Sequence, residues 1–220
     1  MSCDVKTTGE EAVKMRKLIN NWHYISVYFA GVSALVAILG TDNITQKLLL
    51  AAITMMFLHF FEEFGFPGGF PLMGMKVLMG SNEMDSSKWD CNNLSSMFGN
   101  WGFLFLLYFM ALILPDVRFL TLSAMMFLFA EVLMHLLLFN LKLRSFYNPG
   151  FMTAIFGMGP IGVYYFTNVF DSSLYLWYDY VLAVGWFVAV FLFCFRSKIY
   201  WGLGRKEGYA LTDQTAYGMK

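Results

Sequence analysis

Long apolar runs separated by short polar segments dominate the order of residues along the chain. A helix needs roughly 20 mostly apolar residues to cross a hydrocarbon core of about 30 Å. Runs of this kind predict six membrane-spanning helices, at residues 23–41, 46–63, 101–115, 117–141, 151–169 and 174–195. Because their connections are too short for a second domain, we expect an all-α, polytopic membrane bundle that forms one domain over residues 1–220.

The segment 64–100 is the one long connection between these predicted helices. The prolines and glycines at positions 67, 68, 69 and 71 cannot continue a helix. The stretch PLMGMKVLMG that follows is apolar but too short to span, which favours an interfacial or re-entrant segment. A lid over a site and a plain surface loop both agree with this pattern.

The distribution of positive charges predicts the orientation in the membrane. With six spans both termini share one side, and that side collects thirteen Lys and Arg residues against two, Lys47 and Arg118, on the other. The positive-inside rule therefore places the termini, with the segments 1–22 and 197–220, in the cytoplasm. The thirteen are Lys6, Lys14, Arg16, Lys17, Lys76, Lys88, Lys142, Arg144, Arg196, Lys198, Arg205, Lys206 and Lys220.

The composition agrees with a membrane protein, because only 14% of the 220 residues are charged while 58% are hydrophobic. A net charge of zero without a basic patch gives no basis for nucleic-acid binding. The cysteines Cys3, Cys91 and Cys194 lack a CxxC spacing and predict neither a disulfide framework nor a thiolate metal site. No signal-peptide cleavage pattern follows the N-terminus. We expect a multi-pass protein of the plasma or inner membrane of a prokaryote, in an oligomeric state that the sequence leaves open.

Two of the apolar runs carry histidines and carboxylates. HFFEE places His59, Glu62 and Glu63 on one face of a helix, and FLFAEVLMHLLLFN places Glu131 and His135 four residues apart. At a rise of 1.5 Å per residue, His59 lies about 20 Å from the start of its span and Glu131 about 21 Å from the start of its own. Since both spans run towards the cytoplasm, the two sets should meet at one depth.

These residues predict a metal site. A carboxylate in the centre of a span costs roughly 2.5–3.5 kcal/mol and needs a partner, and no Lys or Arg lies at this level. Imidazole and carboxylate suit a divalent metal, with zinc favoured over iron or manganese. The expected ligands are His59, Glu62, Glu131 and His135, while Glu63 or Glu62 serves as general base. The simpler interpretations are a hydrated helix end for the Glu pair and a hydrogen-bonded core histidine.

A turn follows the second set of polar residues. Tyr147, Asn148, Pro149 and Gly150 form it by composition, and Pro149 can begin the next helix. A hinge between two helices explains this turn on its own. At the same interface a lipid head group or carboxylate would meet four candidate substrate-binding residues, Asn100, Arg144, Tyr147 and Asn148.

The combination resembles the HXXEE-motif family of small integral membrane proteins. In that pattern His-x-x-Glu-Glu and a Pro-Gly-Gly-Phe turn are followed by a later His, Arg-x-Tyr-Asn-Pro-Gly and Thr. The matching positions are His59, Glu62, Glu63, Pro67 to Phe70, His135, Arg144, Tyr147 to Gly150 and Thr153. One departure is RSFYNPG, where two residues separate Arg from Tyr. The resemblance covers roughly residues 50–165 and implies metal-dependent chemistry.

The expected function is that of an integral-membrane, metal-dependent enzyme. We expect a hydrolase that uses metal-activated water on a lipid-like or amphipathic substrate at the cytoplasmic leaflet. Membrane lipids and this hydrophobic substrate are the only expected partners. Four alternatives stay open: a proton- or cation-coupled transporter or binding protein, an iron or di-iron oxidoreductase, a metal-free hydrolase similar to CAAX-type intramembrane proteases, and a bis-histidine haem protein. The CAAX pattern places an arginine after the Glu pair, where FGFPG stands here.

Overall fold

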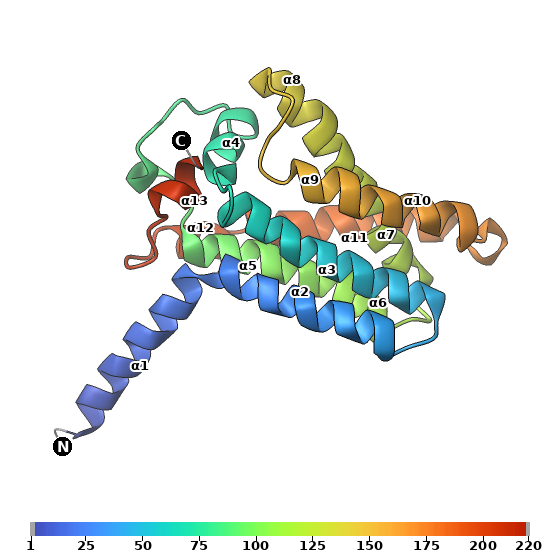
Figure 1. Cartoon of the computed structure of the whole chain (residues 1–220), viewed down its shortest axis with the longest axis horizontal. Helices are drawn as coiled ribbons and strands as arrows, with labels where there is room; N and C mark the ends of the chain where they lie inside the picture. The colour runs from blue at the N-terminus through green and yellow to red at the C-terminus, as the bar shows by residue number, and fades with distance from the viewer. Residues whose placement is uncertain (1–2, 219–220) are drawn as a thin grey trace.

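The structure, a computed structural model, describes residues 3–218, with side chains from residue 10 onwards. Every regular element in that range is helical (Figure 1). Five helices are long and apolar enough to cross a membrane: Trp22–Leu39, Ile44–Phe64, Asn93–Ile113, Arg118–Leu143 and Trp177–Gly204. This confirms an all-helical protein with several candidate spans. Lys220, one of the charges used to predict the orientation, lies outside the described residues.

The elements follow one another in a simple order. The first half contains α1 (Cys3–Asn20), α2 (Trp22–Leu39), α3 (Ile44–Phe64), α4 (Phe70–Val77), η1 (Ser86–Lys88), α5 (Asn93–Leu104), η2 (Phe105–Phe109) and α6 (Met110–Ile113). The second half contains α7 (Arg118–Leu133), η3 (Met134–Phe139), α8 (Asn140–Leu143), α9 (Phe151–Thr153), η4 (Ala154–Met158), α10 (Gly159–Asn168), η5 (Ser172–Leu174), α11 (Trp177–Arg196), α12 (Lys198–Gly204) and α13 (Asp213–Tyr217).

Helices α2 and α3 form a hairpin whose interface is built from small and hydroxyl-bearing residues. The Ser33 and Thr54 hydroxyls are hydrogen-bonded across it at 2.9 Å, and Ala30 and Ala52 are buried. In lipid the hydrophobic effect does not bring helices together, because the lipid tails are as apolar as the side chains. Small residues instead let the two backbones approach closely and pack. The outer face of α2 exposes large apolar side chains, as expected of a lipid-facing surface.

The third span begins earlier than the apolar pattern predicts. Its helix starts at Asn93 instead of residue 101 and continues through η2 and α6 to Ile113. Asn92 caps it by accepting from the Ser95 backbone N–H, while the Ser95 hydroxyl bonds the Asn92 N–H in return. This reciprocal cap satisfies two N–H groups that a helix end leaves free, so the last residues of the predicted loop 64–100 belong to the helix.

Helix α7 continues through η3 into α8, and η3 is a π-helical segment. Two further π-helical segments, η2 and η4, interrupt neighbouring helices. Such bulges shift the side chains after them around the helix axis and are frequent at functional sites. Here η3 contains His135, so the bulge sets the direction of that imidazole.

The fifth predicted span is helical from Phe151 to Asn168, through α9, η4 and α10. It is not among the five candidate spans, because its glycines, proline and tyrosines make it less apolar than the others. Its N-terminus contacts α3 beside His59 and Glu62, as described below.

The loop after α3 is held by the C-terminal segment. Helix α4 is too short to cross a membrane, and α13 packs beside it (Figure 1). Gln214 donates to the Gly65 carbonyl at 2.6 Å, and the Gly69 N–H donates to the Thr215 carbonyl at 3.1 Å. The PGGF turn is therefore fixed by residues almost 150 positions away along the chain.

Candidate metal centre

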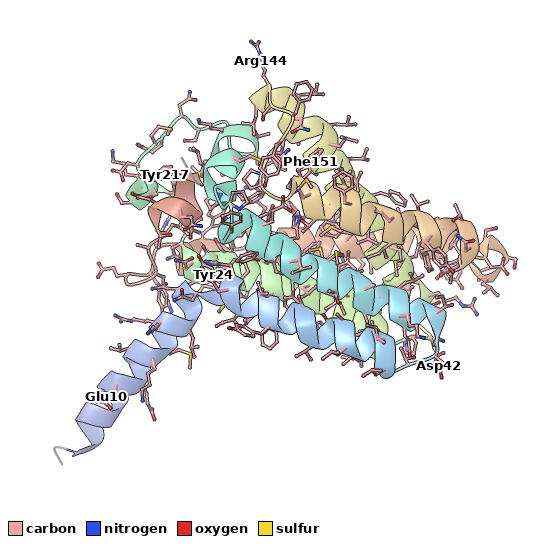
Figure 2. All side chains as sticks on the ribbon, viewed as in Figure 1. Glu10, Tyr24, Asp42, Arg144, Phe151 and Tyr217 are labelled. Carbon is pink, nitrogen blue, oxygen red and sulfur yellow. The ribbon has the colours of Figure 1, made fainter. Side chains whose placement is uncertain are left out.

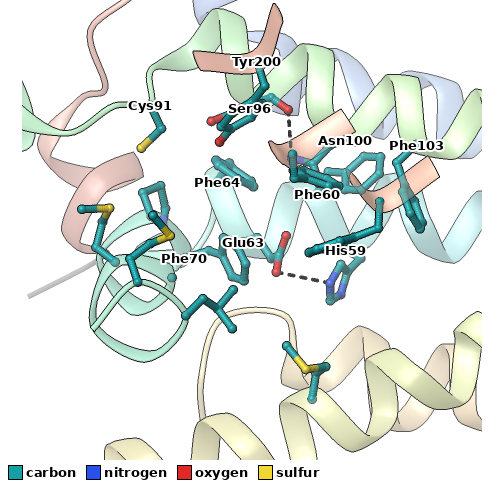
Figure 3. A pocket seen from close by; sticks show the side chains of 18 of the residues that line it. His59, Phe60, Glu63, Phe64, Phe70, Cys91, Ser96, Asn100, Phe103 and Tyr200 are labelled. Carbon is teal, nitrogen blue, oxygen red and sulfur yellow. Dashed lines mark hydrogen bonds and ion pairs between the residues drawn. The ribbon is translucent and has the colours of Figure 1, made fainter. Parts of the chain in front are cut away.

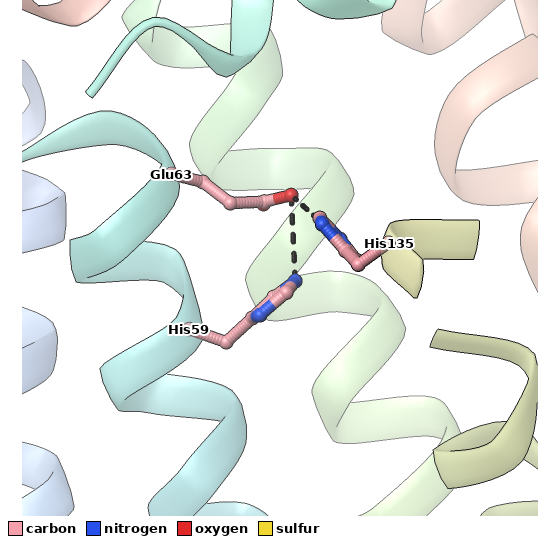
Figure 4. Close-up of side chains that lie close together, drawn as sticks. All are labelled: His59, Glu63 and His135. Carbon is pink, nitrogen blue, oxygen red and sulfur yellow. Dashed lines mark ion pairs between the residues drawn. The ribbon is translucent and has the colours of Figure 1, made fainter. Parts of the chain in front are cut away.

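Two histidines and two carboxylates meet between α3 and the α7–η3 helix, as the comparison of depths predicts. The His59 Nε2 atom lies 3.3 Å from Glu63 Oε1 and 3.7 Å from Glu131 Oε2. His135 Nε2 lies 3.6 Å and 3.4 Å from the same two oxygens. Figure 4 shows both imidazoles directed at the Glu63 carboxylate. We call these four residues the His/Glu cluster.

The hydrogen bonds of Asn148 fix the tautomer of His135. The Asn148 amide nitrogen donates to the His135 carbonyl at 2.8 Å and to Asn140 Oδ1 at 2.7 Å. Its oxygen is therefore the atom that faces His135 Nδ1 at 2.6 Å. An amide oxygen only accepts, so Nδ1 carries the proton and donates it. In the neutral ring, Nε2 then directs a lone pair into the cluster.

Thr153 fixes His59 in the same way. The Thr153 hydroxyl donates its single hydrogen to Glu62 Oε2, which lies 2.6 Å away. The same hydroxyl oxygen lies 2.8 Å from His59 Nδ1. Because the hydrogen is already used, the oxygen accepts from Nδ1–H, and His59 Nε2 also presents a lone pair to the cluster. Both imidazoles thus have the outer hydrogen bond that metal-ligating histidines usually make.

The cluster has the chemistry of a cation site. Its two imidazole lone pairs and two carboxylate oxygens are all acceptors, and the His135 Nε2 atom has no hydrogen-bond partner among the described residues. The ligand atoms of His59, Glu63 and His135 lie within 4.8 Å of one another. Tetrahedral zinc with bonds of about 2.0–2.2 Å separates its ligands by about 3.3–3.6 Å, which matches the distances of Glu63 Oε1 from His59 Nε2 (3.3 Å) and His135 Nε2 (3.6 Å). The residues present therefore fit a divalent metal.

Glu62, which the sequence predicts as a metal ligand or general base, faces away from the cluster. Its Oε1 accepts from the Tyr147 hydroxyl at 3.1 Å and the Met152 N–H at 3.0 Å, and its Oε2 accepts from the Thr153 N–H at 2.9 Å as well as from the Thr153 hydroxyl. Two of these donors are free N–H groups of the helix that starts at Phe151, where a negative charge is stabilised. The structure thus gives Glu62 a full set of donors without a metal.

Gly150 closes the cluster on the side of the YNPG turn. It adopts φ +96°, a conformation that favours glycine. A Cβ atom there would lie 2.6 Å from His59 Cε1 and 2.9 Å from His135 Nε2, and would also collide with His135 Cε1. The glycine lets the backbone approach both rings, and this contact packs them against each other at a centroid distance of 4.8 Å.

A cavity of about 260 Å³ adjoins the cluster (Figure 3). Its walls include eight phenylalanine and four methionine side chains, most of them from α3, α4, α5, α7, η3 and α11. His59, Glu63, Glu131 and His135 all line it. Ligand sites commonly combine an apolar surface with a few convergent polar groups, so the His/Glu cluster is placed where a bound molecule could reach it.

The four predicted substrate-binding residues have different positions. Asn100 lines the cavity, whereas Asn148 is buried behind His135. Tyr147 holds Glu62, and burial, followed by the nearby Glu62 charge, raises the pKa of its hydroxyl, which therefore remains a donor. Arg144 does not line the cavity, and its side chain extends away from the bundle (Figure 2).

Cys91 also lines the cavity but is a poor candidate for chemistry. Burial, with a contribution from Asp90, raises the pKa of its thiol to about 12, so the nucleophilic thiolate is scarce at neutral pH. Thr153 and Asn140, in contrast, have contacts that the sequence does not predict: Thr153 bonds His59 and Glu62, and Asn140 accepts from Asn148. The available signal was the free N–H groups of the helix after Pro149, which require an acceptor.

The fold and the cluster together define a class: a helical membrane protein with a buried histidine and carboxylate site. Residues 49–165, more than half of the chain, match the family described as "protein of unknown function with HXXEE motif", and the chain belongs to this family. This confirms the resemblance seen in the sequence. No curated protein and no solved structure matches the chain.

Proposed function

We propose that the chain is a membrane-embedded, metal-dependent hydrolase that acts on a lipid-like or amphipathic substrate at the cytoplasmic leaflet. The observation that carries the proposal is the meeting of two imidazole lone pairs and two carboxylate oxygens on the wall of an apolar cavity. Two histidines with one carboxylate form a common ligand set of catalytic zinc. The fourth group then supplies the general base that hydrolysis needs.

We assign metal binding to His59, Glu63 and His135, and the role of general base to Glu131. The Glu131 side chain is 19% exposed, against 4% for Glu63, and a base must exchange its proton with water. This assignment differs from the one made from the sequence, in which Glu63 is the base and Glu131 a ligand. A bound divalent ion would polarise the scissile carbonyl and lower the pKa of water to about 7.

The ligand inventory favours one ion over two. Di-iron sites in helical bundles use four glutamates and two histidines. With Glu62 held by four protein donors, the cluster offers two glutamates and two histidines. A single zinc ion is therefore our first choice, and an iron oxidoreductase is the alternative that a metal analysis would reveal.

We infer six spans with both termini in the cytoplasm. The run Phe151–Asn168 begins beside Glu62, near the C-terminal end of α3. Tyr165 near its other end, and Val169 just after it, line a cavity shared with Asn43 and Gln46 at the opposite end of α3. The run thus extends along the full length of α3, which supports a sixth crossing in the plasma or inner membrane of a prokaryote.

Elemental analysis of the purified protein tests the metal site. We expect about one zinc ion per chain in the wild type and almost none in His135→Ala. His23→Ala is the matched control, because His23 lies on α2 outside the cluster and should leave the metal in place. If the wild type binds no transition metal and zinc leaves its thermal stability unchanged, the metal site is wrong and coupling to protons becomes the better interpretation.

Hydrolysis of medium-chain para-nitrophenyl esters tests the reaction. We expect activity that is lost on chelation and restored by zinc. Glu131→Gln should retain the metal but lower kcat by 10²–10⁴-fold, as expected for removal of a general base. If Glu63→Gln instead retains the metal and loses activity, the two carboxylates exchange roles.

A further inference from the structure

We propose that the cavity binds an anionic amphiphile with one hydrocarbon chain. The chain points to the bilayer centre, the scissile bond lies beside the His/Glu cluster, and the anionic group contacts Arg196. This inference names the substrate class and rests on the proposed function. The volume of about 260 Å³ lies just below the usual range of ligand cavities, roughly 300–1,000 Å³, which favours one hydrocarbon chain over two.

The lining of the cavity changes with depth. Its floor consists of four apolar side chains, Met56, Phe103, Phe127 and Phe191. Met56 precedes His59 by three residues on α3, and Phe127 precedes Glu131 by four on α7. Because a helix rises 1.5 Å per residue, the floor lies about 4–6 Å deeper in the membrane than the cluster. A hydrocarbon chain fits this floor, since it offers no polar partner.

The mouth of the cavity lies on the opposite side of the cluster. On α11, Arg196 follows the floor residue Phe191 by five positions, which is about 7–8 Å nearer the interface. On α5, which runs in the opposite direction, the lining residue Ser96 lies one turn nearer the interface than Asn100. Lys88, Tyr200 and Trp201 also line the cavity, and Tyr200 and Trp201 follow Arg196 along the chain. Tyrosine and tryptophan favour the level of lipid head groups. From the bilayer centre outwards the cavity is therefore lined first by apolar side chains, then by the His/Glu cluster and last by polar side chains.

Arg196 is the mouth cation that is free for a ligand. Lys88 lies 3.6 Å from both Glu83 and Asp85. Arg196 instead donates to the Met79 sulfur at 2.9 Å and makes no ion pair within the described part of the chain. A thioether is a weak acceptor, whereas carboxylate and phosphate match the guanidinium fork. An anionic head group would therefore replace the Met79 contact with a stronger one.

The experiment measures binding of radiolabelled dodecyl phosphate to the full-length protein in phosphatidylcholine nanodiscs, with empty nanodiscs as background. We expect saturable binding at one site per chain. Unlabelled dodecyl phosphate and dodecanoate should compete, and their relative strength separates a phosphate from a carboxylate head group. Dodecyltrimethylammonium should compete at least tenfold less well. Metal content is measured on the same samples.

Two pairs of variants locate the ligand. Arg196→Gln should weaken binding about tenfold, while Arg144→Gln, which removes a cation that does not line the cavity, should leave it unchanged. Gly74 lines the cavity, and a Cβ there would meet only Phe70 at an ordinary 3.7 Å. Gly74→Ala should therefore bind normally, and Gly74→Leu should lose binding while the protein keeps its metal.

The outcomes separate this inference from the proposed function. No saturable binding by a protein that holds its metal, or equal competition by the ammonium amphiphile, overturns the substrate class and leaves the metal site intact. Equal binding by Arg196→Gln and wild type overturns the contact with Arg196. Normal binding by a protein that takes up no metal supports the amphiphile site and contradicts the metal-dependent hydrolase.

Discussion

Polar side chains have different partners at the two ends of the bundle. At the end of the bundle where α2 connects to α3, which we call the hairpin end, a second cavity of about 320 Å³ is lined by residues that include the starts of α3 and α7 and the end of α10. There donors meet acceptors: Arg118 donates to the Leu174 carbonyl, and the Tyr165 and Tyr175 hydroxyls are hydrogen-bonded at 3.0 Å. At the end that holds the His/Glu cluster, acceptor faces acceptor. These polar groups at the hairpin end have hydrogen-bond partners within the protein, whereas the acceptors of the His/Glu cluster require protons or a cation.

The difference also distinguishes two neighbouring carboxylates of the HFFEE motif. Glu62 resembles the groups of the hairpin end, because all its partners are donors. Glu63 has two imidazole nitrogens as its neighbours. Residues i and i+1 on a helix point about 100° apart, so the two carboxylates face different neighbours. Glu62 bonds Tyr147, Met152 and Thr153, whereas Glu63 faces the cavity.

The largest effect is expected from Gly150→Ala. Its Cβ would collide with both histidine rings, so we predict a loss of zinc affinity of more than 100-fold and a fall in the free energy of unfolding of about 2–4 kcal/mol from strain and overpacking. Competition with a chelating dye gives the affinity, and chemical denaturation gives the stability.

Gly80→Ala is the control for this prediction. Gly80 has φ +63°, and a Cβ there would have no atom within 4 Å. It should lose about 1–2 kcal/mol from the left-handed backbone alone, with zinc affinity unchanged. Equal zinc affinities for the two variants would mean that the approach of Gly150 to the rings does not shape the cluster.

Glu62→Gln comes next. The amide keeps the shape but removes the charge from the helix N-terminus and from Thr153, so we predict a 10–100-fold loss of zinc affinity, as for other outer partners of metal ligands. Tyr165→Phe, which deletes a hydrogen bond at the hairpin end, should cost about 1 kcal/mol of stability and leave zinc binding intact. If Glu62→Gln loses zinc completely, as a ligand variant does, Glu62 is itself a ligand, as the sequence predicts.

Much of the fold and part of the site follow from the sequence. Apolar runs predict the helices, because burial in lipid needs nothing more than length and hydropathy. The rise per residue predicts that His59 and the pair Glu131 and His135 meet, because two helices that run in the same direction bring equal depths together. The helix start at Asn93 escapes a hydropathy pattern, because a hydrogen-bonded cap determines it.

The direction of each polar side chain could not be predicted. The spacing puts Glu62 and Glu63 on the same broad face, and the neighbour that each one meets depends on the packing of α9 against α3. The π-helical segment η3 changes the direction of His135, and no residue in MHLLLF predicts a π-helical segment. Arg144 belongs to the family pattern, yet it lies at a left-handed helix end with φ 51° and faces outwards.

Thr153→Val tests whether the cluster needs the Thr153 hydroxyl, which accepts from His59 Nδ1 and donates to Glu62 Oε2. Valine keeps the shape of threonine but cannot accept from Nδ1–H, which leaves His59 free to place its proton on Nε2. We predict a loss of zinc affinity of about tenfold. Thr153→Ser retains the hydroxyl and should bind zinc as the wild type does. A loss in both variants would assign the effect to packing and not to the tautomer of His59.

The smallest effect is expected from Tyr147→Phe. The tyrosine supplies one of the four donors to Glu62 and is 40% exposed, so water can replace its hydroxyl at Oε1. A hydrogen bond to a charged group contributes about 1.5–3 kcal/mol when nothing replaces it. Because water can replace this one and the other three donors remain, we predict a loss of zinc affinity of roughly two- to threefold. The sequence, in contrast, predicts a contact with the substrate. If the variant keeps its zinc affinity but raises KM for the ester substrate more than tenfold, Tyr147 contributes to substrate binding and its hydrogen bond to Glu62 does not stabilise the cluster.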